Sequence, residues 1–190
     1  MRMDELTTTV RAARALDASA IARVYIDSWH DTYPGILPTS LLRAMSPKGQ
    51  TARWCTTIAG GASERVLVAE CQKYGVVGMT SLGAALDKAL GYDGEVYTLY
   101  VAPDFFGLGV GSTLLRAAFG ALHASGNSSC VIWAHAQNPA RYFYEAMGGR
   151  LIAERCRPLM GSLVREIAFG WRGLKLDERH AASRDKTIRP

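Results

Sequence analysis

The stretch Val101-Ala-Pro-Asp-Phe-Phe-Gly-Leu-Gly-Val-Gly-Ser112 is the most informative part of this sequence. An apolar run over residues 96–101 leads into it, and an amphipathic stretch over residues 113–123 follows it. A strand, a glycine-rich turn and a helix in this order direct backbone N–H groups and the positive end of a helix dipole toward one point. Such a point binds an anion without any basic side chain. The stretch therefore predicts a phosphate site, most simply for a nucleotide-like cofactor.

Two common phosphate loops do not fit this stretch. A P-loop requires the pattern G-x-x-x-x-G-K-[S/T], in which a lysine reaches the phosphates, and no lysine is present here. A dinucleotide-binding loop requires G-x-G-x-x-G and an acidic residue about 20 positions further on. Position 112 is Ser112, and the residues around Asn127 are not acidic. A plain strand-to-helix turn without a ligand is the alternative interpretation.

Hydrophobic periodicity predicts one α/β domain. Alternating or continuous apolar runs indicate strands, apolar residues at i, i+3 and i+4 indicate helices, and glycine and proline mark the turns. The expected strands are 7–14, 64–71, 74–82, 95–101, 129–135, 151–154 and 163–171. The expected helices are 17–33, with Asp17 as its N-cap, a short one after residue 38, 47–58, 112–125 and 138–147. This order predicts a mixed sheet with helices on both faces, in which the helix at 112–125 connects two parallel strands.

The net charge of +5 is unevenly distributed over the 190 residues. Residues 172–190 carry six Lys/Arg and three Asp/Glu, so they contribute +3, and the rest of the chain is nearly balanced. A basic patch over the whole domain, as nucleic-acid binding requires, is not indicated. We expect a mobile, solvated tail beyond about residue 173, with a nucleic-acid contact through this tail as the alternative.

The sequence gives no sign of a metal site or a membrane segment. The four histidines lack the spacing of metal ligands. No apolar run approaches the roughly 18 residues of a membrane span, and the N-terminus has no signal-peptide core. We therefore expect a cytoplasmic protein that binds no metal, no nucleic acid and no membrane.

Two ordered motifs share the spacing of a known family. The first reads V-x-P-x-x-x-G-x-G-x-G from Val101 and is followed by a helix, and the second reads Asn138-Pro-Ala-Arg-Tyr-Phe-Tyr-Glu-Ala-Met-Gly148. With both motifs the chain resembles the GNAT superfamily of acetyl-CoA-dependent N-acyltransferases over roughly residues 7–172. The resemblance implies a mixed, mostly antiparallel sheet of six to seven strands, one acyltransferase domain over residues 1–172, and a polar basic tail over residues 173–190.

The resemblance also implies how acetyl-CoA is bound. Backbone N–H groups hold its pyrophosphate, and they belong to Phe106, Gly107, Leu108, Gly109, Val110, Gly111 and Ser112. Backbone groups of Leu99, Tyr100 and Val101 pair with the pantetheine arm and polarise the thioester carbonyl. Asn138 and Tyr144 match functional positions of the second motif, and Tyr144 protonates or hydrogen-bonds the departing thiolate. Without a function, Asn138 is a helix N-cap and Tyr144 a core residue.

The chain departs from the family pattern at two positions. The family has Gln or Arg where this chain has Phe106, and Gly-Phe where this chain has Gly148-Gly149. Because backbone donors do most of the phosphate binding, we expect binding to survive, with lower affinity or with the Phe106 ring packed on the cofactor. The departures keep a second hypothesis open, a non-catalytic acyl-CoA-binding regulatory module with the same fold.

Glu95 is the candidate catalytic base. In histone-type members of the family a Glu lies six residues before the matching Val, as Glu95 does before Val101. Strand alternation predicts that Glu95, Tyr97, Leu99 and Val101 share a face. A carboxylate in a mostly apolar cleft has a raised pKa and can accept an ammonium proton, directly or through water. The alternative is a solvated glutamate at a strand edge, with no role in the reaction.

Acceptor choice in the family depends on the segment between the first two helices and on the last hairpin, here 29–37 and 157–162. Trp29, Tyr33 and Tyr97 are the candidate acceptor-binding side chains. The segment Trp29, His30, Asp31 and Tyr33 offers an aromatic wall with one carboxylate, that of Asp31, which suits a cationic amine. Core packing is the alternative for Trp29. The sequence thus predicts an N-acetyltransferase that moves an acetyl group from acetyl-CoA to an amine of a small molecule or peptide by direct transfer in a ternary complex. A homodimer through the closing strands is expected by analogy alone.

Overall fold

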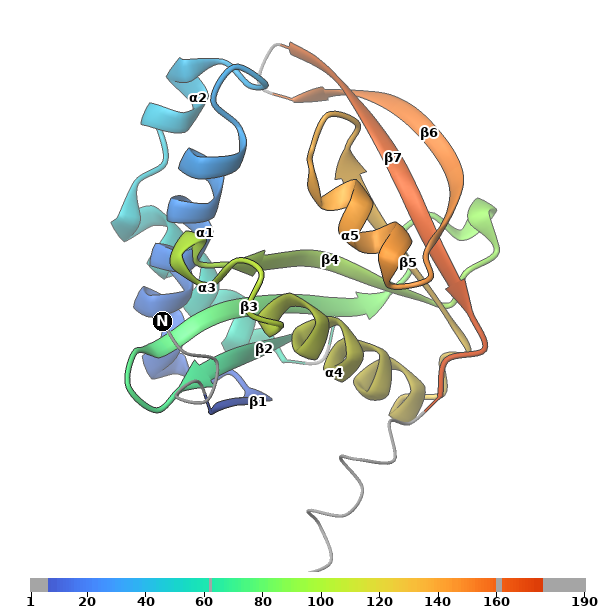
Figure 1. Ribbon diagram of the computed structural model, residues 1–190, viewed down its shortest axis with the longest axis horizontal. Helices are drawn as coiled ribbons and strands as arrows, with labels where there is room; N and C mark the ends of the chain where they lie inside the picture. Colours follow the sequence, from blue (N-terminus) through green and yellow to red (C-terminus); the bar gives the residue numbers. More distant parts are fainter. Residues whose placement is uncertain (1–6, 62, 160–161, 176–190) are drawn as a thin grey trace, which may run out of the picture.

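The computed structural model describes residues 7–61, 63–159 and 162–175 (Figure 1). Its strands are β1 (Thr8–Ala12), β2 (Glu64–Cys71), β3 (Gly75–Ala84), β4 (Gly94–Val101), β5 (Ser129–His135), β6 (Arg150–Leu159) and β7 (Ser162–Arg172). Its α-helices are α1 (Ala18–Thr32), α2 (Thr39–Arg43), α3 (Pro47–Gly60), α4 (Val110–Ala124) and α5 (Ala140–Ala146). Short 3-10 turns are η2 (Ala15–Asp17), η3 (Lys88–Leu90) and η4 (Pro103–Phe105).

The strands form one seven-stranded sheet in the order β1-β2-β3-β4-β5-β7-β6. Neighbouring strands are antiparallel except β4 and β5, which are parallel. The helix α4 connects these two strands, because parallel neighbours require a crossover. The predicted mixed, mostly antiparallel sheet is confirmed.

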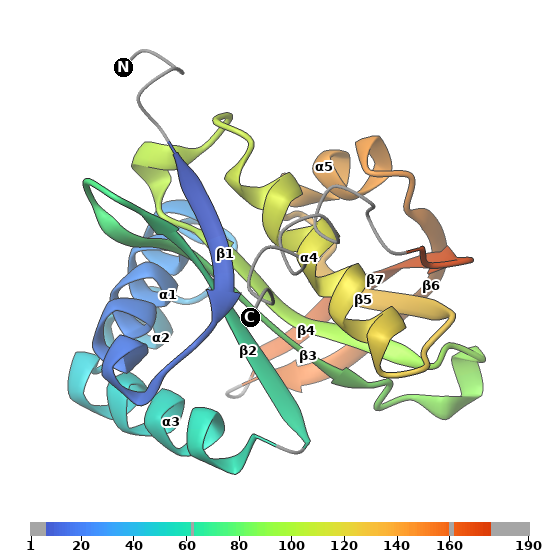
Figure 2. The same cartoon turned by 90° about the horizontal axis from the view of Figure 1, so that it is seen from below.

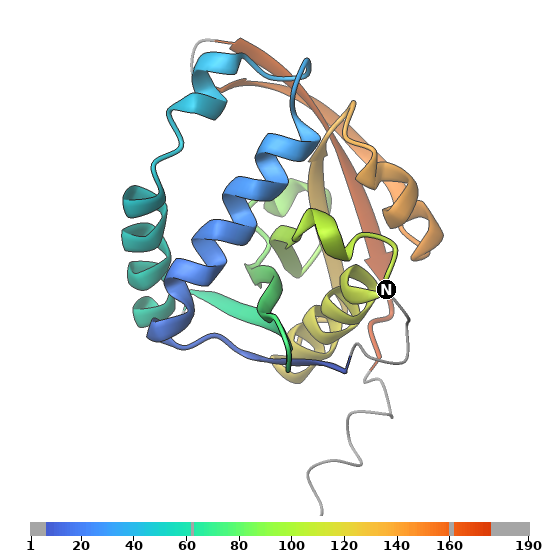
Figure 3. The same cartoon turned by 60° about the vertical axis from the view of Figure 1, so that its left-hand side comes forward.

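Helices cover both faces of this sheet, as predicted (Figure 2). On one face α1 and α3 enclose a core that includes Ile21, Trp54 and Met79. On the other face α4 and α5 pack over a core that includes Leu115 and Phe169. Figure 3 shows α1 and α3 on one side of β2 and β3 and α4 on the other. The helices α1 and α4 each bury the apolar stripe that a 3.6-residue period predicts.

The strands β4 and β5 pair only near their first residues. Residues 94–96 of β4 are in parallel register with residues 130–132 of β5, but β4 continues to Val101 and β5 to His135. Along its whole length β5 pairs instead with β7. Beyond residues 96 and 132 the two strands therefore diverge and leave an opening in the sheet (Figure 1).

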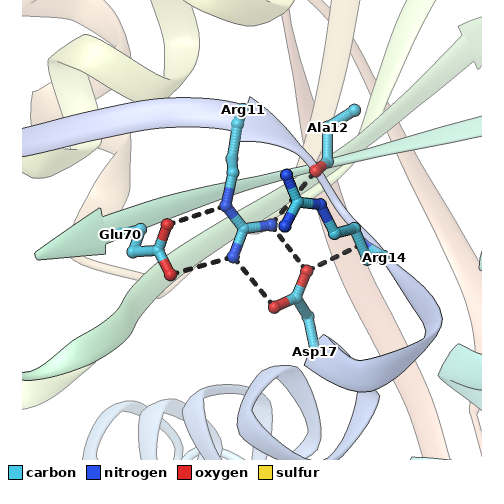
Figure 4. A network of polar contacts seen from close by, with 5 residues as sticks. All are labelled: Arg11, Ala12, Arg14, Asp17 and Glu70. Carbon is cyan, nitrogen blue, oxygen red and sulfur yellow. Dashed lines mark hydrogen bonds and ion pairs between the residues drawn. The ribbon is translucent and has the colours of Figure 1, made fainter.

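A network of charged side chains joins β1, β2 and the turn before α1 (Figure 4). Arg11 donates hydrogen bonds of 2.7 and 3.0 Å to Glu70 and of 2.7 and 2.9 Å to Asp17. The Asp17 carboxylate also accepts the N–H of Arg14 at 2.7 Å. The Arg11 guanidinium is the main reason that the pKa of Asp17 lies below its usual value. Asp17 occupies the N-cap position of α1 as predicted, but its side chain makes no capping hydrogen bond there. The carboxylate instead accepts the two hydrogen bonds from Arg11.

Several element boundaries differ from the predicted ones. The helix α4 begins at Val110 rather than at 112, and β6 is longer than the predicted 151–154 because it pairs with β7 over its length. At the C-terminal end Leu174 is buried in the core, and its N–H donates to the carbonyl of Ser128 at 3.0 Å. The packed domain therefore extends beyond residue 172. Most of the predicted tail, residues 176–190, lies outside the described residues.

Candidate active site

The glycine turn lies at the N-terminus of α4. Gly107 has a φ of 73° and Gly109 a φ of 81°, a left-handed conformation that other residues adopt only with strain. The first N–H groups of an α-helix have no acceptor within the helix. In α4 the first helical hydrogen bond is donated by the N–H of Thr113 to the carbonyl of Gly109, at 3.1 Å. The N–H groups that are left to bind an anion belong to Val110, Gly111 and Ser112.

Two other amides of the turn are already engaged. The N–H of Phe106 donates to the carbonyl of Pro103 at 3.1 Å, and the N–H of Leu108 donates to the carbonyl of Phe105 at 3.5 Å. The structure departs from the prediction here, because these two donors are not free in this conformation. Pyrophosphate binding by the remaining amides of the turn stays a prediction.

An inner cavity of about 150 Å³ lies in the opening between β4 and β5. The four residues 97–100 of β4 and the four residues 132–135 of β5 line it. The predicted acceptor-binding residues Trp29, Tyr33 and Tyr97 all lie on its wall. The structure thus brings these three side chains together, and their contact with an acceptor stays a prediction.

Tyr144 of α5 also lines this cavity. Its side chain is only 5% exposed and packs against the rings of Phe169 and Trp171, with centroid distances of 5.6 and 6.3 Å. Burial raises the pKa of the Tyr144 hydroxyl well above its usual value. The phenol therefore stays protonated at neutral pH and can act as a hydrogen-bond or proton donor.

Asn138 links α5 to α1. Its Oδ1 accepts the N–H of Ala140 at 2.9 Å, which is the expected capping role, and its Nδ2 donates to the hydroxyl of Tyr33 at 3.1 Å. The amide therefore holds Tyr33 at the cavity wall. A direct contact between Asn138 and the cofactor stays a prediction.

Glu95 is buried but is not among the side chains that line the cavity. It is 6% exposed, and its Oε2 accepts the N–H of Leu86 at 2.9 Å. Burial raises the pKa of Glu95, although the hydrogen bond from Leu86 opposes this shift. The raised pKa agrees with a role as a base, whereas the alternative of a solvated glutamate does not fit this burial.

A β-bulge changes the direction in which Glu95 points. Between Val96 and Thr98 the register with β3 shifts, so Tyr97 is an extra residue in β4. Alternation of side chains is interrupted at such a bulge. Val96 and Leu99, three residues apart, consequently both pack into the core beneath α4. Glu95 therefore lies on the opposite face from Leu99, so the predicted shared face is wrong for Glu95, whereas Leu99 and Val101 do pack in one cluster.

A charged cluster on β6 and β7 borders the cavity that the predicted acceptor-binding residues also line, and we name it the acceptor-side wall. The sequence interpretation missed it. Glu166 lines the cavity, and its two carboxylate oxygens accept hydrogen bonds from the Nε of Arg155 at 2.8 Å and the Nε of Arg157 at 2.7 Å. The guanidinium of Arg155 stacks on the ring of Trp133, 3.8 Å from its centroid. The alternation Arg155-x-Arg157 is visible in the sequence, but the hairpin register that places Glu166 opposite is not.

His135 lies between the inner cavity and an outer cavity of about 680 Å³. The outer cavity is lined by residues 35–39, 135–137 and 163–165, so the predicted loop and the last hairpin both contribute. The Nδ1 of His135 accepts the N–H of Gln137 at 3.1 Å, which assigns the ring proton to Nε2. Burial lowers the pKa of His135, although Glu166 opposes the shift, so the ring is neutral at pH 7.

Two classes of feature are absent from the described part of the chain. No group of three or more His, Cys, Asp or Glu residues among the described residues could hold a metal ion. In the same residues no helix is long and apolar enough to cross a membrane. A reaction without a metal ion stays a prediction from the sequence.

Sequence comparison identifies relatives of the chain. The model of the GNAT acetyltransferase domain matches residues 62–148. YuaI, an uncharacterized N-acetyltransferase of Bacillus subtilis (strain 168), is 34% identical over 163 residues, which are 86% of this chain and 92% of that protein. This second likeness covers both motifs and nearly the whole sheet.

Solved structures share the fold. A GCN5-related N-acetyltransferase from Rhodopseudomonas palustris has a TM-score of 0.70 at 20% identity, over 87% of this chain and 96% of that one. The PaiA N-acetyltransferase from Thermoplasma acidophilum, solved with coenzyme A, has a TM-score of 0.67 at 19% identity, over 87% and 99%. The YncA protein from Salmonella typhimurium, solved with acetyl-CoA, has a TM-score of 0.63 at 20% identity, over 97% and 98%. Together with the motifs and the extended likeness to YuaI, this shows that the chain belongs to the GNAT acetyltransferase family.

Proposed function

We propose that the protein is an N-acetyltransferase that moves the acetyl group of acetyl-CoA to an amine of a small molecule or peptide, directly within a ternary complex. The observation that carries the proposal is that three features adjoin one another around the second half of β4. They are the free N–H groups at the start of α4, the diverging strands β4 and β5, and the protonated phenol of Tyr144. A Cβ on Gly111 of α4 would contact Val101 of β4 and Phe143, the neighbour of Tyr144.

The residues of this opening fit acetyl-CoA. The free amides of α4 suit the charge and size of a pyrophosphate. Within the described sheet, the edge of β4 that faces β5 has no strand partner beyond Val96, so backbone groups of residues 97–101 can pair with the pantetheine amides. PaiA and YncA, whose structures contain coenzyme A and acetyl-CoA, share the fold. When bound, acetyl-CoA supplies the acetyl group as a reactive thioester.

The transfer forms a C–N bond and breaks a C–S bond. The acceptor amine loses one proton, and the departing thiolate gains one. Tyr144 is the donor for the thiolate, because its phenol is protonated and lies on the cavity wall. Glu95 is the proposed base, and it acts through water because its carboxylate is not among the groups that line the cavity.

A non-catalytic acyl-CoA-binding module is the second candidate. Phe106 favours it, since this side chain is 48% exposed at the turn and supplies no polar group for the pyrophosphate. Gly149 does not favour it, because a Cβ at this position would lie 2.5 Å from Cζ2 of Trp171. The close approach of Trp171 therefore explains why this chain has a glycine at position 149.

Two measurements separate the candidates. Calorimetry with coenzyme A and acetyl-CoA tests binding, and free-thiol release from acetyl-CoA across a panel of amines tests transfer, with amine-free samples as the background. Binding with amine-dependent thiol release supports the acetyltransferase. Binding without release for any amine supports the module, and the lack of binding contradicts both.

Three predictions from the sequence stand beside this proposal. They are a homodimer formed through β6 and β7, a cytoplasmic location, and the lack of a nucleic-acid partner. Sedimentation of the full chain tests the first, and titration with duplex DNA at low salt tests the third, because phosphate contacts are strongest there.

A further inference from the structure

The acceptor-side wall carries more positive than negative charge. Arg155 and Arg157 share the single carboxylate of Glu166, each through its Nε, so the cluster has one positive charge without a counter-charge. The Arg155 guanidinium is stacked on the ring of Trp133. Of the two arginines, Arg157 is the more exposed one and the one that lines the inner cavity.

Arg157 has free donors beside the cavity. Its side chain is 49% exposed and lines the inner cavity. The bond to Glu166 uses Nε, and within the described residues neither Nη group has a protein acceptor. A guanidinium with both Nη groups free binds a carboxylate in a bidentate manner. The bond to Glu166 also restricts the arginine, which lowers the entropy lost when a ligand binds.

Trp133 supplies another donor on the same wall. It lines the inner cavity, and its buried Nε1 has no acceptor among the described residues. A buried donor without an acceptor is unfavourable, and an oxygen of a ligand satisfies it. His135 adds the N–H of its Nε2, since its Nδ1 already accepts a backbone hydrogen bond. The wall is therefore rich in donors, while both oxygens of Glu166 are occupied.

Resting on the proposed function, we infer that the acceptor is an amino acid or a similar small amine that carries a carboxylate, and that the Nη groups of Arg157 bind this carboxylate. The aromatic side chains Trp29, Tyr33 and Tyr97 line the same cavity and receive the amine end, since aromatic faces attract an ammonium group. Arg157 is thus a specificity-determining residue. It does not take part in the transfer itself.

Matched acceptors test the substrate class. Each standard L-amino acid and its carboxamide have the same side chain and an amine in the same place. The acid carries a charged carboxylate where the carboxamide carries a neutral amide. We expect the best acid to exceed its carboxamide about tenfold or more in kcat/KM, the size of one charge-assisted hydrogen bond. The amine of the carboxamide is less basic, so a larger share of it is neutral and reactive at a given pH. The basicity of the amine therefore cannot explain a preference for the acid. Equal or better use of the carboxamide in every pair overturns the inference and leaves acetyl transfer intact.

Two variants test the assignment to Arg157. Arg157→Gln and Arg155→Gln each remove one charge and one hydrogen bond to Glu166, but only Arg157 lines the cavity. We expect Arg157→Gln to lower the ratio of acid to carboxamide in kcat/KM about tenfold or more and to leave the affinity for coenzyme A unchanged. Arg155→Gln should keep the wild-type ratio of acid to carboxamide. Loss of this ratio in both variants, or in neither, overturns the assignment.

A binding measurement makes the test independent of turnover. The protein saturated with coenzyme A is titrated in a calorimeter with the same amino acids and carboxamides. Selective binding of acids that is lost in Arg157→Gln supports the inference even if no transfer is detected, in which case only the proposed catalysis fails. Binding of coenzyme A without any acid-selective binding overturns the inference.

Discussion

The proposed cofactor side and the proposed acceptor side of the opening offer different parts of the chain for binding. At the start of α4 the groups available for binding are backbone N–H groups, positioned by the left-handed Gly107 and Gly109. On the β5–β7–β6 wall they are side chains, and the pairing of three strands brings them together. The first arrangement depends on local backbone geometry. The second depends on which strands are neighbours and on their register.

This difference determines how each side responds to substitution. On the cofactor side a change of backbone conformation should weaken binding even when no charge is altered. On the acceptor side a change of charge should alter specificity or stability while the backbone stays in place. The predictions below test this separation, from the largest expected effect to the smallest.

Removal of the Tyr144 hydroxyl should have the largest effect. We expect Tyr144→Phe to lower kcat about 100-fold, the lower range for the loss of a general acid, and to leave the affinity for coenzyme A unchanged. Tyr142→Phe is the matched control, because Tyr142 lies on the same helix and is 68% exposed. Steady-state kinetics and calorimetry check both variants. An unchanged kcat in Tyr144→Phe would remove this residue from the mechanism.

A side chain at the glycine turn should weaken cofactor binding. Gly109→Ala places a Cβ at a φ of 81°, which costs about 1–2 kcal/mol in backbone strain, so we expect the Kd for coenzyme A to rise about tenfold. Gly120→Ala is the control, because this glycine lies inside the same helix with no atom near the added Cβ. It should bind normally and gain about 1 kcal/mol of stability. Equal affinity in the two variants would contradict a backbone-based phosphate site.

Loss of the shared carboxylate should destabilise the acceptor side. Glu166→Gln leaves two arginines without a counter-charge, and we expect a loss of about 1–2 kcal/mol in the free energy of unfolding, less than for a fully buried pair because both arginines are partly exposed. Glu154→Gln breaks the exposed pair with Arg165, and its loss should stay below about 0.5 kcal/mol. Urea denaturation at pH 7 measures both. Similar losses would mean that the cluster has no special role in stability.

Glu95 should show the smallest effect, in the pH dependence of stability. Burial raises the pKa of Glu95 in the folded state, so the folded protein holds this proton more tightly than the unfolded chain does. The contribution of protonated Glu95 to the free energy of unfolding is therefore fully present below the unfolded pKa of 4.5. It is lost as the pH rises through the folded pKa. Wild type should lose stability relative to Glu95→Gln over this interval. Urea titrations of both proteins across it check the sign, and a constant difference would argue against a raised pKa.

Much of the cofactor side could be predicted from the sequence. The order of strand, glycine turn and helix, the N-cap role of Asn138 and the position of Tyr144 on the sheet-facing side of α5 all follow from spacings within a dozen residues. Helical and extended periods fix such relations locally. The prediction departs from the structure where the turn uses its own amides, at Phe106 and Leu108, since internal bonds of a turn depend on its detailed conformation.

The acceptor side was decided by the tertiary structure. The same holds away from the acceptor side, where the Asp17 side chain does not cap α1 because it accepts hydrogen bonds from Arg11, which also bonds to Glu70. Glu95 lies on the other face of the sheet from the predicted one because Tyr97 is an extra residue in β4 relative to β3. The contact between Arg157 and Glu166 exists only in one register of the last hairpin.

The sequence alone therefore determined the family and the fold class, and it predicts a backbone site for a phosphate, because residue spacing fixes short-range geometry. Only the folded sheet decided which charged side chains meet at the acceptor wall. The physical reason is that a shift of one residue in strand pairing turns every side chain to the other face, and this register is set by the packing of distant segments.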